Sequence, residues 1–173
     1  ALKAGIGLLP EDRQIQGLIN ELPIYQNVSS ANMDKFIKGG ALNERAEIAT
    51  AIELCQKIQL KASDISAPPS SLSGGNQQKV IIAREVTNDK DLLIAVNPTR
   101  GLDVGAIEFV HKYLVEQRNK NRAVLLVSFE LDEIMSLSDR IEVIFDGQIT
   151  GSVVGKDADE KELGYLMAGG KQA

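Results

Sequence analysis

The apolar residues in the second half of the chain form short continuous runs, separated by segments with helical spacing. Two such runs, Leu92–Val96 and Ala123–Val127, flank Val104–Asn119, whose apolar residues recur with the period of a helix. An earlier run, Ile6–Leu9, is stopped by Pro10. Because continuous apolar strands are typical of parallel sheets covered on both faces, these patterns predict an α/β fold.

The segment from residue 23 to about residue 60 has a helical pattern and stands outside that alternation. Its clearest helix is expected to begin after Asn43, a residue type that caps helix N-termini. A break at 63–71, which contains two adjacent prolines, is the candidate hinge or linker. Spacings of three and four predict one buried face of that helix, with Cys55 as a small core residue, made of Ile48, Ile52, Cys55 and Ile58.

The end of the chain predicts a short helix, a hairpin and a closing helix. Asp146-Gly147 is typical of a tight turn between two antiparallel strands. Gly169-Gly170 predicts the end of the closing helix. The expected elements occupy 131–137, 141–145, 148–154 and 157–167.

Composition and charge narrow the classes of function. The chain has 173 residues, of which 43% are hydrophobic and 25% charged, the balance of an ordinary globular domain. Its net charge of −5 disfavours a nucleic-acid-binding protein, which usually carries a basic surface. A single cysteine, Cys55, excludes an internal disulfide, and with a single histidine, His111, it disfavours a structural zinc site. No apolar run approaches the ~20 residues that span a bilayer, so we expect a soluble protein in a reducing compartment.

The strongest candidate for chemistry is the stretch Leu72-Ser73-Gly74-Gly75-Asn76-Gln77-Gln78-Lys79, which is followed by helical spacing. Ser73 can cap that helix, and Gly74 and Gly75 let a ligand approach the backbone closely. The N–H groups of the first helical turn suit a phosphate. The same residues also fit a plain loop that caps a surface helix, and the local chemistry leaves both interpretations open.

Two further stretches follow expected strands, where ligands gather in open α/β sheets. Residues 97–103, Asn-Pro-Thr-Arg-Gly-Leu-Asp, come after one strand, and Ser128-Phe129-Glu130 comes after the next. Asp103 is placed either to cap the following helix or to reach a partner across an interface, whereas Glu130 fits a solvated helix face. The sequence contains no Gly-x-x-x-x-Gly-Lys-[Ser/Thr] phosphate loop and no credible Ser/His/Asp or Cys/His constellation.

Together these residues resemble the ATP-binding cassette of ABC transporters over nearly the whole chain. Residues 72–79 are similar to the signature motif in the form typical of sugar importers, and Gly101-Leu102-Asp103 is similar to the D-loop. By position, residues 92–99 resemble the Walker B strand, 128–131 the switch-histidine segment and 9–13 the Q-loop region. The sequence of residues 98–106 is similar to that of the second cassette in the two-cassette ATPases that serve simple-sugar and nucleoside importers.

Four positions depart from the family pattern at places that the resemblance makes catalytic. Val96 stands for the Walker B aspartate, Asn97 for the catalytic glutamate, Phe129 for the switch histidine and Glu11 for the Q-loop glutamine. Valine offers a metal no oxygen, asparagine cannot accept a proton as a carboxylate does, and phenylalanine cannot hydrogen-bond a phosphate. The resemblance therefore implies a degenerate half-site with no intact catalytic residue and no metal ligand, and it points toward the nucleoside branch.

The resemblance also implies that this sequence is part of a longer cassette, because the Walker A loop and an antiparallel β-subdomain precede the Q-loop in the family. The expected fold is an incomplete P-loop NTPase-type parallel sheet with an all-helical subdomain insert and a C-terminal β-hairpin. It divides into a Q-loop strand and loop at 1–14, a helical subdomain with the signature at 15–88, and the C-terminal half of the ATPase core at 89–173.

By resemblance, the chain is part of the ATP-binding subunit of an importer for a simple sugar or a nucleoside. Its signature would complete the ATP site of a partner cassette, and its helical subdomain would meet the membrane permease on the cytoplasmic face of the plasma membrane. ATP and Mg²⁺ are expected in the full-length assembly, with neither bound tightly to this piece, which is expected to be inactive alone. The implied ATP-binding residues are Ser73, Gly74, Gly75, Asn76 and Gln77, with Asp103 in the D-loop and Glu11 at the Q-loop position.

Two other classes of function remain as alternatives. One is a non-catalytic regulatory or interaction module with the same fold, which the replacements at Val96, Asn97 and Phe129 favour and the intact signature disfavours. The other is an ABC ATPase of translation or DNA repair, which the net charge of −5 and the sugar-importer form of the signature disfavour.

The resemblance raises a question about the sheet. In the family, the Walker A strand lies between the strand that ends near Ser128 and the strand that begins near Ile141. Without it, buried backbone groups would lack partners, which is costly. We therefore expect these two strands either to pair directly or to exchange with those of a second copy.

Overall fold

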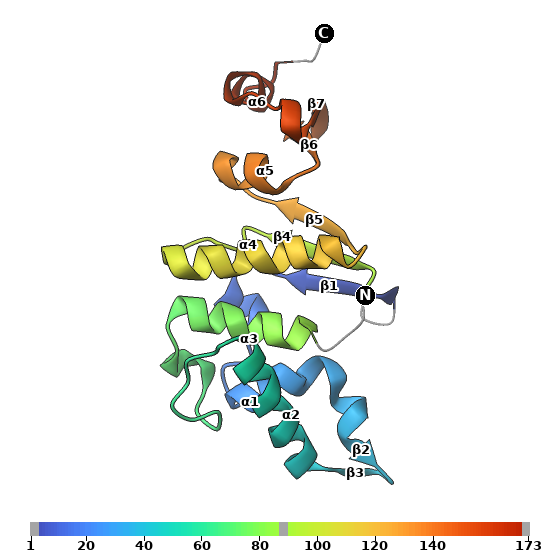
Figure 1. Ribbon diagram of the computed structural model, residues 1–173, viewed down its shortest axis with the longest axis vertical. Helices are drawn as coiled ribbons and strands as arrows, with labels where there is room; N and C mark the ends of the chain where they lie inside the picture. The colour runs from blue at the N-terminus through green and yellow to red at the C-terminus, as the bar shows by residue number, and fades with distance from the viewer. Residues whose placement is uncertain (1–3, 87–89, 171–173) are drawn as a thin grey trace. The chain divides into compact units, whose positions relative to one another are not determined.

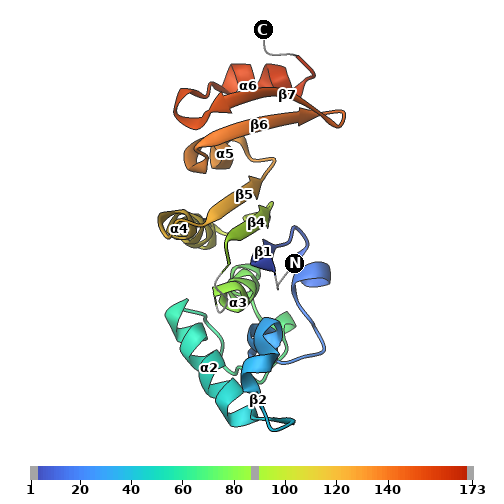
Figure 2. The same ribbon diagram turned by 90° about the vertical axis from the view of Figure 1, so that its right-hand side faces the viewer.

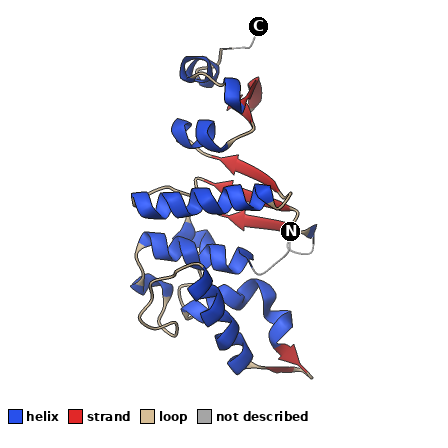
Figure 3. Ribbon diagram, viewed as in Figure 1, coloured by secondary structure: helices blue, strands red, loops and turns tan. Residues whose placement is uncertain are grey.

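The computed structural model describes residues 4–86 and 90–170. These residues form two compact units, one up to Leu125 and the other from Leu126 onward. Figure 1 labels the helices and strands along the chain, and Figure 3 distinguishes them by colour. The expected α/β fold class is confirmed by a three-stranded sheet, several helices and a terminal hairpin.

The sheet of the first unit has the strand order β1-β4-β5 (Figure 2), and its strands are Ile6–Leu9, Leu92–Val96 and Ala123–Val127. β1 and β4 are parallel, with Ile6 opposite Leu92. The helices α3 (Gly74–Val86) and α4 (Val104–Asn119) contact each other, and α3 also contacts β1. All these elements begin and end close to where the apolar pattern predicts. Their buried side chains form the core that fixes the loops described below, and include Leu9, Val80, Ile81, Ile82, Leu93, Ala95, Val110 and Leu114.

The segment expected to be helical from 23 to 60 is interrupted, so that prediction was partly wrong. Two short helical pieces, α1 (Ile24–Ser29) and a 3-10 helix (Ser30–Phe36), lead into an antiparallel pair, β2 (Ile37–Lys38) and β3 (Ala41–Leu42). Gly39 and Gly40 join these strands with φ angles of +59° and +83°. Such angles are open to glycine and end a helix, so the two glycines break the helical pattern.

The helix expected after Asn43 is confirmed as α2 (Glu44–Lys57). The Asn43 side chain accepts a hydrogen bond from the backbone N–H of Ala46 at 3.2 Å. Cys55 is buried as expected, but Ile52 is 41% exposed, so its assignment to the buried face was wrong. α1 packs against α2, and the buried face of α2 contains Ala51 and Cys55.

The second unit contains α5 (Leu131–Leu137), β6 (Arg140–Phe145), β7 (Gln148–Val154) and α6 (Glu160–Met167). β6 and β7 are antiparallel, and the turn residues Asp146 and Gly147 have φ angles of +47° and +73°, as a tight hairpin turn requires. α6 begins at Glu160 rather than at 157, because Asp159 caps it by accepting from the N–H groups of Lys161 and Glu162. The core of this unit consists of Ile141, Val143, Val153, Leu163 and Leu166.

The two routes expected to close the gap, direct pairing and exchange with a second copy, both stay predictions, because β6 belongs to the second unit. β5 is paired with β4, and β6 is paired with β7 in a separate sheet. On β5, which crosses the boundary between the two units, Leu125 and Val127 are 52% and 44% exposed. In the described part of the chain, no helix is long and apolar enough to cross a membrane.

Candidate functional site

The start of α3 contains the residues that resemble the signature motif. Ser73 immediately precedes the helix, and its carbonyl accepts from the N–H of Gln77 at 2.9 Å. The hydroxyl of Ser73 accepts from the Asn76 side-chain amide at 3.0 Å, and Asn76 Oδ1 accepts from the N–H of Lys61 at 3.0 Å. Asn76 therefore ties the start of α3 to the loop that follows α2.

Gly75 lies where two helices begin side by side. A Cβ atom added to Gly75 would lie 2.7 Å from the Cβ of Ala106 in α4 and 3.5 Å from Asp103 Oδ2. Asp103 is the N-cap of α4, and its Oδ1 accepts from the N–H of Ala106 at 2.9 Å. The structure thus brings Gly75 and Asp103 together, although 28 positions separate them in the sequence. Of the two roles left open for Asp103, helix capping is the one that this structure shows.

The side chains of Gln77 and Lys79 bind backbone carbonyls of the protein itself. Gln77 is buried, and its side chain donates to the carbonyl of Pro69 at 3.2 Å, which fixes the loop before the helix. Lys79 Nζ donates to the carbonyl of Gln59 at 2.9 Å and lies 4.7 Å from the centre of the Phe109 ring. Burial lowers the pKa of Lys79, and neighbouring Lys61 lowers it further, while the Asp103 carboxylate opposes the shift.

The loop after β4 holds the residues that stand for the Walker B carboxylates. Val96 ends the strand and is partly buried. Asn97 is buried and has a φ of +42°, a left-handed conformation that asparagine tolerates better than most residues. The carbonyl of Asn97 accepts from the N–H of Arg100 at 3.1 Å and closes the turn. An aliphatic side chain and a neutral amide do not fit a site for Mg²⁺, which prefers carboxylate oxygens.

The segment after β1 reaches across to this same loop. Arg13 Nη1 donates to the carbonyl of Arg100 at 2.8 Å, and Arg100 Nη1 forms an ion pair with Glu11 Oε1 at 2.6 Å. Between them, Asp12 caps a short helical turn by accepting from the N–H groups of Gln14 and Ile15. Glu11 thus lies beside the loop that ends at Asp103.

Arg13 is the residue of this region to which the sequence assigned no role. A Cβ atom added to Gly74 would lie 2.8 Å from Arg13 Nη2, so the guanidinium lies against the first residue of α3. Arg13 and Arg100 are 87 positions apart, and no periodicity relates them. The available signal was the presence of charged residues directly after two predicted strands, where ligands and partner groups gather.

Phe129 belongs to the second unit. It is 77% exposed and lies two positions after the end of β5. Next to it, the hydroxyl of Ser128 accepts from the N–H of Glu130 at 3.0 Å, just before α5 begins. The expectation that Phe129 shares a site with Asn97 and Val96 stays a prediction.

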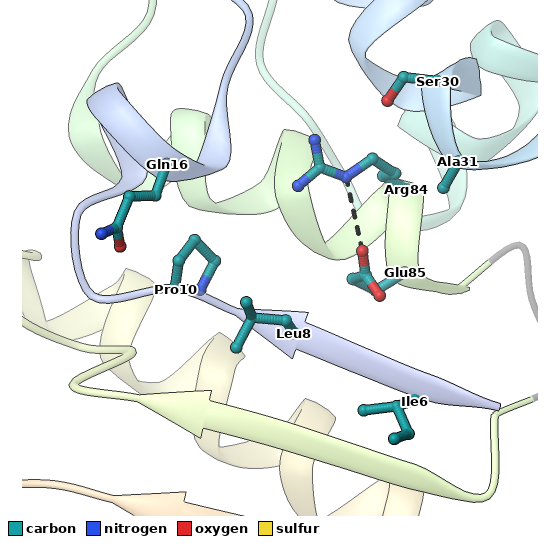
Figure 4. Close-up of a pocket in the computed structure, with 8 residues that line it drawn as sticks. All are labelled: Ile6, Leu8, Pro10, Gln16, Ser30, Ala31, Arg84 and Glu85. Atoms are coloured by element: carbon teal, nitrogen blue, oxygen red, sulfur yellow. Dashed lines mark ion pairs between the residues drawn. The ribbon is translucent and has the colours of Figure 1, made fainter. Parts of the chain in front are cut away.

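A pocket of about 280 Å³ lies elsewhere in the first unit, between β1 and the helices (Figure 4). Ile6, Leu8 and Pro10 form its apolar side. On the opposite side, Arg84 Nε lies 3.5 Å from Glu85 Oε1. The pocket is not lined by residues of the signature or of the 97–103 loop, so it does not belong to the candidate nucleotide site.

The first part of the chain matches a known protein family. The family model described as "ABC transporter" matches residues 1–100. The guanosine import ATP-binding protein NupO of Bacillus subtilis (strain 168) is 49% identical over 172 residues, which cover 98% of this chain and 34% of that protein. The nucleoside import ATP-binding protein NupA of Lactococcus lactis subsp. cremoris (strain MG1363) is 47% identical over 167 residues, which cover 95% of this chain and 33% of that protein.

A solved structure supports the fold. The dimeric structure of a post-hydrolysis state of the ATP-binding cassette MJ0796, bound to ADP and Pi, has a TM-score of 0.73 and 24% sequence identity. The similarity covers 90% of this chain and 65% of that chain. The chain spans about a third of the length of NupO and NupA. Since the family model covers more than half of its residues, the chain belongs to the ABC transporter family.

Proposed function

We propose that this chain is part of the ATP-binding subunit of an importer and that it contributes a signature motif to the ATP site of a partner cassette. The observation that carries the proposal is the start of α3, where Gly75 lies close to the Asp103 carboxylate and to α4. In a member of the ABC transporter family, this is a helix N-terminus next to a loop that resembles the D-loop.

Ser73, Gly74 and Gly75 are the residues that would hold the phosphate groups of ATP. The N-terminus of a helix of 13 residues carries a partial positive charge and directs N–H groups outward, which suits an anion. Bound ATP would supply the phosphoryl group. Asn76 and Gln77 support the site indirectly, because their side chains fix the loops around the start of α3.

The half-site of this cassette itself is proposed to hydrolyse ATP poorly. Val96 offers Mg²⁺ no oxygen, and the amide of Asn97 can orient a water molecule without taking its proton. Phosphoryl transfer depends on groups that position and neutralise the phosphates, so these replacements remove much of its stabilisation. Phe129 adds a third replacement under the same proposal. The division into parts at 1–14, 15–88 and 89–173 is proposed with it.

The proposed cargo is a nucleoside or a simple sugar, and the names of NupO and NupA support the nucleoside. The proposed partners are a second cassette and a membrane permease, which the helical subdomain would contact on the cytoplasmic face of the membrane. A non-catalytic interaction module is the second candidate, and the side chains of Val96 and Asn97 favour it.

The proposal is tested on the full-length ATP-binding subunit that contains this sequence, assembled with its permease in proteoliposomes. We expect Gly75→Asp to lower nucleoside-stimulated ATPase activity by about 100-fold and well below Gly75→Asn, which adds the same bulk against Ala106 without placing a negative charge where the phosphates would bind. Ser73→Ala, which adds no bulk, should lower it by about tenfold. Gly164→Ala is the matched control, since a Cβ atom there has nothing within 4 Å. Unchanged activity in Gly75→Asp and Ser73→Ala would favour the non-catalytic module.

The isolated chain provides a second test. Backbone amide NMR shifts on addition of ATP should be weak and confined to residues 72–79, with or without Mg²⁺. Tight binding that depends on Mg²⁺ would contradict the assignment of the phosphate site to the signature alone.

A further inference from the structure

Two arginines, Arg13 and Arg100, connect the segment after β1 to the loop after β4. Arg13 donates to the backbone carbonyl of Arg100 at 2.8 Å, and the Arg100 side chain returns to Glu11 at 2.6 Å. The Arg100–Glu11 arm is open to solvent, with side-chain exposures of 71% and 38%. Exposed ion pairs contribute little. The Arg13 hydrogen bond is exposed as well, but it holds the backbone of the loop rather than a side chain.

The position of Arg13 is electrostatically unfavourable in the chain by itself. Its Nη2 lies 2.8 Å from the site of a Cβ at Gly74, the first residue of α3. A cation at a helix N-terminus faces the positive end of the helix dipole. In addition, Arg13 Nε is buried and has no hydrogen-bond partner in the described part of the chain. An unsatisfied buried donor of this kind lowers the stability of the folded state.

An anion at the start of α3 would remove the electrostatic part of this cost. It would contact both the helix N-terminus and the guanidinium beside it, and the same guanidinium donates to the carbonyl of Arg100 in the loop that ends at Asp103. We propose that Arg13 is a positioning residue, which couples a phosphate at the signature to the loop that resembles the D-loop. This inference rests on the proposed function, because the anion is the phosphate of the nucleotide that the signature is proposed to contact.

The coupling makes a kinetic prediction for the full-length ATP-binding subunit, assembled with its permease in proteoliposomes. Arg13→Gln should lower the kcat of ATP hydrolysis by about tenfold, because small misplacements of positioning groups have large effects on rate. The KM for ATP should change by less than about twofold, since a positioning residue that acts in the transition state alters kcat rather than KM. Arg13→Lys keeps the charge and one donor, and it should recover part of the loss.

Three controls separate this role from general stabilisation. Arg100→Gln removes only the exposed ion pair and leaves the backbone carbonyl, so its kcat should fall by less than about twofold. Arg118→Gln removes an exposed arginine at the end of α4 and should leave kcat unchanged. The melting temperature of the subunit should be the same for Arg13→Gln and Arg118→Gln, whereas a purely structural role would lower it in Arg13→Gln alone.

The outcomes distinguish the two proposals. If Gly75→Asp abolishes ATP hydrolysis but Arg13→Gln behaves like Arg118→Gln, the role of Arg13 is refuted and the proposed function stands. A fall in kcat that is matched by a lower melting temperature would also overturn the positioning role. If Gly75→Asp leaves hydrolysis intact, the proposed function fails, and the inference fails with it.

Discussion

At the scale of single residues, Gly75 meets two demands at once. It lies in the stretch proposed to contact phosphate, and it lets α3 approach α4 to within contact of the Ala106 methyl group. A glycine in this position therefore has a packing reason that holds whether or not a nucleotide binds. Measurements of stability and of activity are both needed to separate the two.

Substitution of Gly75 should reveal the packing reason. Gly75→Ala places a Cβ 2.7 Å from that of Ala106, so the helices must shift, and we expect the free energy of unfolding to fall by about 1–3 kcal/mol. Gly164→Ala adds the same atom to a helix with nothing within 4 Å, and it should stabilise by about 0.5–1 kcal/mol. Urea unfolding of both variants is the measurement. Equal effects of the two substitutions would refute the packing argument.

The thiol of Cys55 should be inert in the folded protein. Burial raises its pKa from 9.0 to about 11, so little thiolate forms at neutral pH. The folded state then holds its proton more tightly than the unfolded state, and the contribution of Cys55 to stability falls as pH rises from 9 to about 11. At pH 8, a thiol reagent should react at least about tenfold more slowly with native than with urea-unfolded protein. Equal rates would show that Cys55 is accessible.

At the scale of elements, side-chain caps decide where the helices begin. Asn43, Asp103 and Asp159 each accept hydrogen bonds from the first turns of α2, α4 and α6. These bonds satisfy N–H groups that have no partner within a helix. The cap at Asp103 also holds the carboxylate beside Gly75, so local helix chemistry helps to build the proposed site.

Removal of the cap on α4 should be measurable. Asp103→Ala loses the bond to the N–H of Ala106, and we expect the free energy of unfolding to fall by about 1 kcal/mol. Asp103→Asn keeps an acceptor oxygen, so the free energy of unfolding should fall by only a few tenths of 1 kcal/mol. The midpoints of thermal unfolding give the comparison. If both variants lose the same stability, the charge of Asp103 matters rather than its capping bond.

At the scale of the whole molecule, the edge of the sheet at β5 is the feature that favours association with another copy of the chain. β5 is hydrogen-bonded to β4, and it is the last strand in the order β1-β4-β5 of the described sheet. Leu125 and Val127 are exposed on this strand. Free strand edges with apolar side chains are templates for pairing with another chain.

The isolated chain should therefore self-associate through β5. Sedimentation velocity should show a dimer whose fraction increases with protein concentration. This dimer would form by strand exchange or by edge pairing. Leu125→Lys places a charge on the edge strand and should shift the chain toward monomer. Lys112→Gln, on the exposed surface of α4, is the control and should not. A monomer at all concentrations would eliminate both strand exchange and edge pairing between two copies.

The sequence by itself determined the elements whose signals are local. The apolar runs predict β1, β4 and β5, the Asp146-Gly147 pair predicts the hairpin turn, and Asn43 predicts the start of α2. The signature-like stretch was also visible, because glycines and a helix start are adjacent in the chain. These features depend on neighbouring residues, so periodicity and turn chemistry suffice to find them.

Only the tertiary structure decided which distant residues meet. The contact of Arg13 with Arg100, the approach of Gly75 to Ala106 and the exposure of Ile52 depend on how the helices and strands pack. The open edge of β5 depends on which strands lie beside it. No local pattern encodes such choices, because the interactions join positions far apart in the sequence and form only when the core is assembled.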